Sequence, residues 1–192
     1  MRKFAIGSGV LAVAIAFSAH AQAGTIVYTA NLDGPSEAPP NASPGTGFAT
    51  LTIDPDLHTM RLEATFSDLI GTTTASHIHA RTAVPGAGTA GVATQVPSFV
   101  GFPLGVTSGS YDMTFDMTLA SSYNPSFITN NGGTTATAEA ALFQAIADGS
   151  AYLNIHSTQF GGGEIRGFFQ IPEPASLSLL GLGGLVLLRR RG

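Results

Sequence analysis

The sequence predicts an all-β fold, an antiparallel β-sandwich or Greek-key barrel of about seven to nine strands with one short helix. Polar and apolar residues alternate with a period close to two along most of the chain, and clusters of Gly, Pro, Asn and Asp separate the alternating runs. Only 10% of the 192 residues are charged, 24 are Gly, and Cys is absent. This composition favours strands and turns, and without disulfides the fold must rest on its hydrophobic core.

Residues 1–23 are expected to be a secretory signal peptide. Two basic residues precede an apolar run over 4–17, and the segment closes on an A-x-A cleavage site that ends at Ala23. A membrane anchor, the alternative, would need a longer apolar run. We therefore expect export by the Sec machinery, cleavage by signal peptidase, and a mature β-domain over 24–171.

Seven strands are expected in the mature domain. The alternation is strictest over 60–66 and 111–117, where one apolar face opposes one polar face. The other candidates, in chain order, are 25–32, 47–53, 76–81, 151–156 and 164–171. This many short strands with turn signals between them is typical of a sandwich or barrel.

One stretch breaks the period of two and predicts the helix. Apolar residues recur at helical spacing over 137–148, with Thr137 able to cap the start and Gly149 the end. We expect this helix to cover one end of the sheets. Two long Gly/Pro-rich segments, 33–46 and 83–110, are expected to be ordered loops, and loops of such length are often functional.

The mature part of the chain is acidic. Five of the eight basic residues lie in the two ends, which leaves three Arg and eleven acidic residues between Gly24 and Pro172, a formal net charge of −8 with no Lys. Such a surface repels nucleic acid and anionic lipid headgroups. We therefore expect no nucleic-acid partner.

Residues 172–192 are expected to form a second targeting segment. An apolar run follows the first three residues of this segment, and it is shorter than the roughly 20 residues that a membrane-crossing helix needs. It can still insert as a hydrophobic helix with the terminal Arg on the cytoplasmic side. The segment opens with Pro172, Glu173 and Pro174 and closes with Arg189, Arg190 and Arg191.

This order of parts resembles the PEP-CTERM sorting signal of Gram-negative bacteria. The resemblance implies transient anchoring in the inner membrane, cleavage near Pro172 to Pro174 by a membrane protease of the exosortase type, and release to the cell surface or extracellular matrix. A plain tail anchor is the alternative.

The residues that carry chemistry lie on three predicted strands. Alternation over 76–80 puts His77 and His79 on one face and Ile78 on the other. Over 152–156 the same rule directs Asn154 and His156 away from the apolar face. Glu164 and Arg166 share one face of the last strand.

Three blocks of the sequence resemble the CHRD domain, a family named from the extracellular protein chordin and common in bacterial exported proteins. The blocks are Leu-Asp-Gly-Pro-Ser-Glu-Ala-Pro-Pro at 32–40, the His77-Ile78-His79 strand, and the run over 149–167 that contains Leu-Asn-Ile-His and Gly-Gly-Glu-Ile-Arg-Gly. The similarity covers about 28–170. It implies a β-sandwich of poorly defined molecular function.

Three interpretations of the polar residues compete. The favoured one is a structural polar network in which Glu164 pairs with Arg166 or a histidine and Asn154 satisfies loop backbone. The second is a Cu or Zn site made by His77, His79 and His156, because imidazoles are common ligands of both metals. The third is enzymatic, since His-x-His on a β-sandwich is similar to part of the Cu/Zn superoxide dismutase site.

Full dismutase chemistry is not expected, because that enzyme's two-metal centre uses more histidines than the four that follow the signal peptide. The chain also has no G-x-S-x-G elbow, P-loop or H-E-x-x-H motif, so no enzyme is predicted. We expect an exported structural or binding protein of the cell surface or biofilm matrix, with exopolysaccharide or other matrix components as partners. The alternative is an exported protein that binds Cu or Zn.

Overall fold

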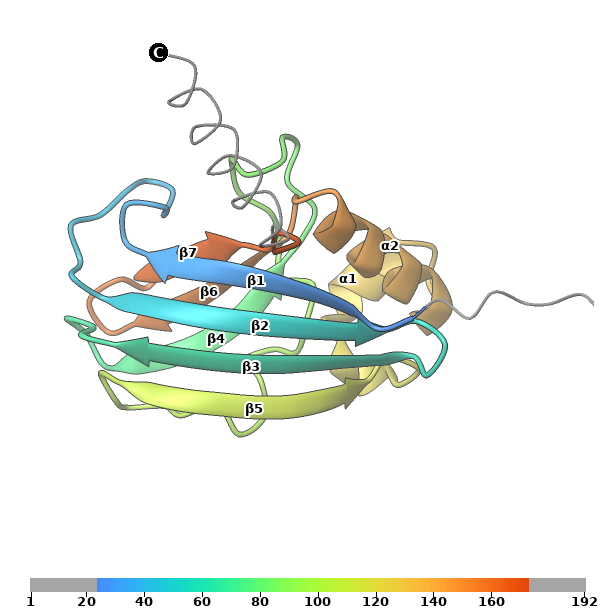
Figure 1. Cartoon of the computed structure of the whole chain (residues 1–192), viewed down its shortest axis with the longest axis horizontal. Coiled ribbons are helices and arrows are strands. Elements are labelled where there is room, and N and C mark those ends of the chain that lie inside the picture. Colours follow the sequence, from blue (N-terminus) through green and yellow to red (C-terminus); the bar gives the residue numbers. More distant parts are fainter. Residues whose placement is uncertain (1–23, 173–192) are drawn as a thin grey trace, which may run out of the picture.

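Seven antiparallel strands form one curled sheet in the computed structural model, which describes residues 24–172 (Figure 1). The predicted all-β class and each of the seven predicted strands are confirmed. The strands are β1 (Ile26–Asp33), β2 (Thr46–Asp54), β3 (Thr59–Ser67), β4 (Thr73–His79), β5 (Gly109–Asp116), β6 (Tyr152–Ser157) and β7 (Ile165–Phe168).

The sheet has the strand order β4-β6-β7-β1-β2-β3-β5 and curls into two wings. One wing holds β4, β6 and β7, and the other holds β1, β2, β3 and β5; in Figure 1 the first lies behind the second. The wings join where β1 pairs with β7, through Asp33 opposite Arg166 and a bridge between Thr29 and Gln170. A Cβ at Gly167 would overlap the backbone carbonyl of Asn31, so this join requires glycine.

The core lies between the two wings. Every second residue of β3 is buried, as the alternation predicts, and the opposite wing contributes apolar side chains that face it. Ile78 of β4 and Ile155 of β6 are both completely buried. The expectation that two apolar faces of sheet meet is therefore confirmed.

Two α-helices close one end of the sheet, α1 (Pro125–Asn130) and α2 (Thr135–Ala147), after a 3₁₀ turn at Ala120–Ser122 (Figure 1). The predicted helix is α2, which begins two residues early because Thr134 is its N-cap and Thr137 completes a capping box. Gly149 follows the helix with a φ of 67°. The sequence did not predict α1, which is too short for a hydrophobic period to show.

The two long loops are held by backbone hydrogen bonds. In the first, the Gly34 carbonyl accepts the N–H groups of Glu37 and Asn41. The second, residues 80–108, runs along the edge of β4 that β6 leaves free, where Ala93 N–H donates to the Ile78 carbonyl and Phe99 N–H to the Ser76 carbonyl. This loop therefore protects a strand edge from pairing with another chain.

The two predicted targeting segments lie outside the described residues, except for the exposed Pro172 at the boundary. No helix within residues 24–172 is long and apolar enough to cross a membrane. The predictions that fall outside concern Ala23, Glu173, Pro174, Arg189, Arg190 and Arg191.

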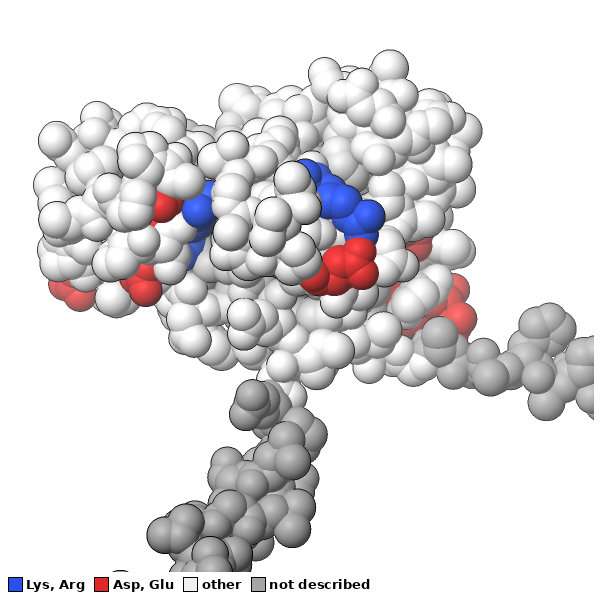
Figure 2. Space-filling model, turned by 90° about the horizontal axis from the view of Figure 1, so that it is seen from above, with Lys and Arg blue, Asp and Glu red and all other residues white. Residues whose placement is uncertain are grey.

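Charged groups are sparse on the described surface. Figure 2 shows a face on which basic atoms occupy two small areas, each next to acidic atoms, and most of the remaining area is uncharged. On this face the basic atoms do not gather into one extended patch.

Candidate metal centre

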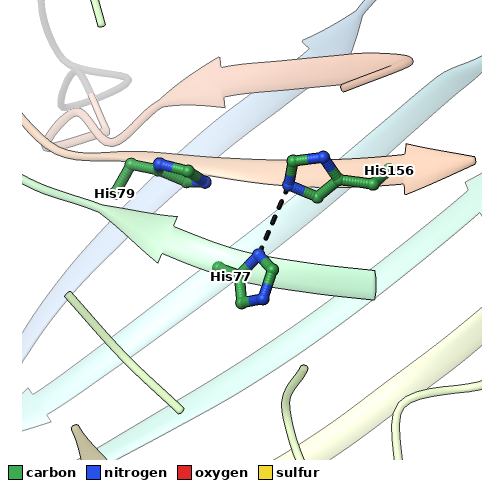
Figure 3. A group of neighbouring side chains, drawn as sticks. All are labelled: His77, His79 and His156. Carbon is green, nitrogen blue, oxygen red and sulfur yellow. Dashed lines mark hydrogen bonds between the residues drawn. The ribbon is translucent and has the colours of Figure 1, made fainter. Parts of the chain in front are cut away.

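Three imidazoles meet on the outer face of the first wing. His77 and His79 come from β4, and His156 comes from the neighbouring strand β6 (Figure 3). One ring nitrogen from each lies within 4.8 Å of those of the other two. The structure thus brings together all three histidines that the sequence singled out.

Loops cover these imidazoles, which the period of two does not predict. His77 is only 7% exposed and His79 9%, because the 80–108 loop lies over them, while His156 is partly open to solvent. The alternation along a strand predicts which face of the sheet a side chain lies on. It does not predict which other segments cover that face. The site is therefore a shielded one with access beside His156.

Each imidazole is hydrogen-bonded to a backbone carbonyl. The oxygen of Pro97 lies 2.7 Å from His77 Nε2, that of Ala90 lies 2.9 Å from His79 Nδ1, and that of Gly161 lies 3.0 Å from His156 Nδ1. A carbonyl oxygen only accepts, so these three nitrogens carry the ring protons. The other nitrogens, His77 Nδ1, His79 Nε2 and His156 Nε2, are left with lone pairs.

The lone pairs face one another. His77 Nδ1 and His156 Nε2 are 3.3 Å apart, drawn as the dashed line in Figure 3, and His79 Nε2 is buried with no hydrogen-bond partner among the described residues. Two such nitrogens cannot bond to each other unless a proton or a metal ion lies between them. A cation between these two nitrogens would satisfy both lone pairs.

Protons are poor candidates for that cation at neutral pH. Burial lowers the pKa of His77 and of His156. Burial also lowers the pKa of His79 to about 4, and the positive charges of neighbouring groups that include Arg166 add to this effect. The three rings stay neutral, which is the form that binds metal.

The spacing suits a first-row metal ion. Two nitrogens bound to Zn at about 2.0–2.1 Å with tetrahedral angles are about 3.3–3.4 Å apart, and His77 and His156 already have this separation. All three ligand nitrogens lie within 4.8 Å of one another, so completing the set would need a closer approach of up to about 1.4 Å. The carbonyl partners of the outer nitrogens correspond to the groups that orient histidine ligands in metal sites.

Aromatic stacking holds His79 in place. The Tyr152 ring stacks on the His79 ring with centroids 4.9 Å apart and an interplanar angle of 5°. The hydroxyl of Tyr152 accepts the N–H of Ala90, whose carbonyl is the partner of His79. The Arg166 guanidinium lies 4.8 Å from the centre of the Tyr152 ring.

Glu164 is fully buried and does not pair with Arg166 or a histidine, so the expected pairing is wrong. Its carboxylate accepts from the Ser43 hydroxyl at 2.6 Å and from the N–H groups of Ile70 and Gly71. Burial acts to raise the pKa of Glu164, but its hydrogen bonds together outweigh burial and lower the pKa. The carboxylate therefore joins two loops to the sheet.

Arg166 instead faces Glu37, a residue that sequence reasoning missed. Its Nε lies 3.9 Å from the Glu37 carboxylate, and the guanidinium donates to the carbonyls of Ser36 and Gly88. Glu37 is 6% exposed, and burial raises its pKa to about 7 although Arg166 opposes the shift. Glu37 lies in a loop, where side chains do not alternate as they do in a strand. The only sign of its role in the sequence is its position in the first CHRD-like block.

Asn154 lies between the histidines and this pair. It is opposite His77 on β4 and Arg166 on β7, and its amide N–H donates to the Gly162 carbonyl at 3.4 Å, in line with the expected contact to loop backbone. Its Oδ1 and the Glu37 Oε1 have no hydrogen-bond partner among the described residues. A Cβ at Gly163 would overlap both oxygens.

Comparison with known families gives two matches. The model of the CHRD domain matches residues 28–169, and the model of the PEP-CTERM protein-sorting motif matches residues 170–191. No curated protein and no solved structure matches the chain. Both resemblances found in the sequence are confirmed.

Proposed function

This chain belongs to the CHRD domain family and ends in a PEP-CTERM sorting motif, and from that premise we propose that its exported domain binds one Cu or Zn ion. The sorting motif indicates export to the cell envelope or surface through exosortase-type machinery. The proposed ligands are His77, His79 and His156.

One observation carries the proposal. One ring nitrogen of each imidazole lies within 4.8 Å of those of the other two, and each ring has one nitrogen hydrogen-bonded to a backbone carbonyl. A polar network that served only to join strands would use the facing nitrogens as donor and acceptor, whereas here they are all acceptors. This favours a metal over the purely structural interpretation.

The loops around the three histidines orient the imidazoles and shield them from water. The carbonyls of Pro97, Ala90 and Gly161 keep the outer nitrogens protonated, and the loop over His77 and His79 limits water. A bound ion would supply a Lewis acid and, if it were Cu, a redox centre. Because N-donor sites follow the Irving–Williams order, we expect Cu(II) to bind more tightly than Zn(II).

Metal analysis of the exported protein, purified without chelator and then titrated with Cu(II) and Zn(II), tests this function. We expect about one equivalent to bind with three imidazole ligands, and the His77→Ala/His79→Ala variant to lose it. The matched control is His58→Ala, because His58 lies outside the cluster and pairs with Glu139. Failure of both metals to bind, or equal binding by the double variant, would refute the proposal.

We also propose that the mature protein resides at the cell surface or in the biofilm matrix, after cleavage near Pro172 to Pro174. The sorting motif and the acidic, Lys-free composition of residues 24–172 support this location. Matrix components such as exopolysaccharide are the proposed partners. Cell fractionation with and without residues 172–192 is the test, and an unchanged distribution would contradict it.

A further inference from the structure

A pocket of about 580 Å³ lies between α1, α2 and the chain that follows β4. It is built by other residues than the histidines, at the end of the sheet that the helices close (Figure 1). This volume is within the range of pockets that hold small molecules. Its polar lining includes Arg81, Ser126, Asn130, Asn131 and Gln144.

The lining side chains include hydrogen-bond donors and acceptors that bind no other described residue. Gln144 donates to Asp148 at 2.7 Å, and Asn131 donates to the Phe127 carbonyl at 2.8 Å. The side-chain carbonyl oxygens of both residues have no hydrogen-bond partner among the described residues. The side chains of Asn130 and Ser126 make no hydrogen bond to any residue within 24–172. Amide and hydroxyl groups thus line one hollow ready to bond to a ligand.

The pocket carries no unpaired charge. Among the lining residues that the structure describes, Arg81 is the single charged one, and its guanidinium forms an ion pair with the Asp148 carboxylate. A phosphate or carboxylate ligand would require a cation that is not already paired, and an ammonium ligand would require an acid. Apolar contact comes from Phe127, Ala140 and Ala141.

We propose that this pocket binds an uncharged saccharide. Sugar hydroxyls both donate and accept, which matches side-chain amides and hydroxyls, and the C–H faces of a sugar ring match small apolar side chains. The inference is independent of the metal centre. It concerns a ligand of the kind that an exported envelope protein meets, either as a free sugar or as part of a neutral polysaccharide.

An NMR titration of the ¹⁵N-labelled protein with maltose and cellobiose tests the proposal, with a digalacturonate as the charged comparison. We expect shifts of the Asn130 and Gln144 side-chain amides at millimolar sugar, with little response to digalacturonate. Asn130→Ala/Gln144→Ala should weaken binding at least about tenfold, since two hydrogen bonds are lost. Both residues are exposed, so the variant should keep the fold.

Gln159→Ala is the matched control, because it removes an exposed amide outside the pocket and should leave binding unchanged. Retention on insoluble starch or cellulose would assign the site to a polymer, and binding of the disaccharides alone would assign it to free sugar; either result supports the proposal. Three results would overturn it: no response to either neutral sugar, equal binding by the double variant, or equal binding of digalacturonate.

Discussion

His77 Nδ1 and His156 Nε2 face each other at 3.3 Å from adjacent strands, and neither has a proton to share. The carbonyls of Pro97 and Gly161 bind the N–H of each ring on its far side. Two lone pairs at this distance repel until a cation lies between them.

Metal binding should stabilise the fold. An ion that binds only the folded state at 100 times its Kd adds about 2.7 kcal/mol, which corresponds to a rise in Tm of roughly 5–10 °C for a domain of this size. Thermal unfolding with and without Cu(II) or Zn(II) measures the shift. It should persist in His58→Ala and vanish in His77→Ala/His79→Ala; a shift in that double variant would place the metal elsewhere.

Glu37→Gln should remove part of the pH dependence of stability. Burial raises the Glu37 pKa from 4.5 to about 7, so the folded protein holds this proton while the unfolded chain releases it. The stabilising contribution is complete below pH 4.5 and is lost as pH rises through about 7, at a cost of about 3 kcal/mol. The variant should therefore lose less stability than the natural protein between pH 5 and 8.

Urea unfolding at those two pH values measures the difference. Titration of the buried histidines is common to both proteins and cancels in the comparison. The control is Glu63→Gln, whose partly exposed carboxylate on β3 pairs with Arg61. Parallel pH profiles for natural protein and Glu37→Gln would show that Glu37 ionises normally in the fold.

Glu164→Ala should destabilise the domain by roughly 2–4 kcal/mol. It deletes a buried acceptor and leaves the N–H groups of Ile70 and Gly71 and the Ser43 hydroxyl unpaired. Glu164→Gln should cost less, because an amide oxygen still accepts. Chemical denaturation measures both, against Glu63→Ala, which should change stability by about 0.5 kcal/mol or less.

The pKa of His58 should lie above the ordinary value of a histidine. The hydrogen bond and the negative charge of Glu139, whose carboxylate is 2.9 Å from His58 Nδ1, raise the His58 pKa. The pair therefore stabilises the fold at low pH and loses this effect as pH rises through the raised value. NMR titration of the imidazole in natural protein and in Glu139→Gln measures it; identical midpoints would contradict the contact.

The strands could be predicted from the sequence because burial on one face of a sheet imposes a period of two on side chains. The ends of the strands are harder to predict than their centres. The predicted strand over 76–81 begins at Thr73 in the structure, where a register shift between Thr73 and Ala75 interrupts the alternation. The predicted strand over 164–171 is limited in the structure to Ile165–Phe168.

Alternation predicts the face of each imidazole, and the shared site of the three histidines is one of three interpretations that the sequence leaves open. Alternation gives the face of each imidazole, whereas the pairing of β4 with β6 decides that His156 comes beside His77. The carbonyls that set the ring protons belong to loops without a periodic signal. The same reason explains why Glu37, and the partners of Glu164, could not be read from the sequence.

The pairing of Thr29 with Gln170 has a consequence for the proposed cleavage near Pro172. Only Ile171 separates this last bridge from Pro172, so a protease that cuts near Pro172 works within about 7 Å of the closed sheet. The domain has almost no tether there. If the sheet closes before the proposed cut, the protease would therefore act directly beside the folded domain.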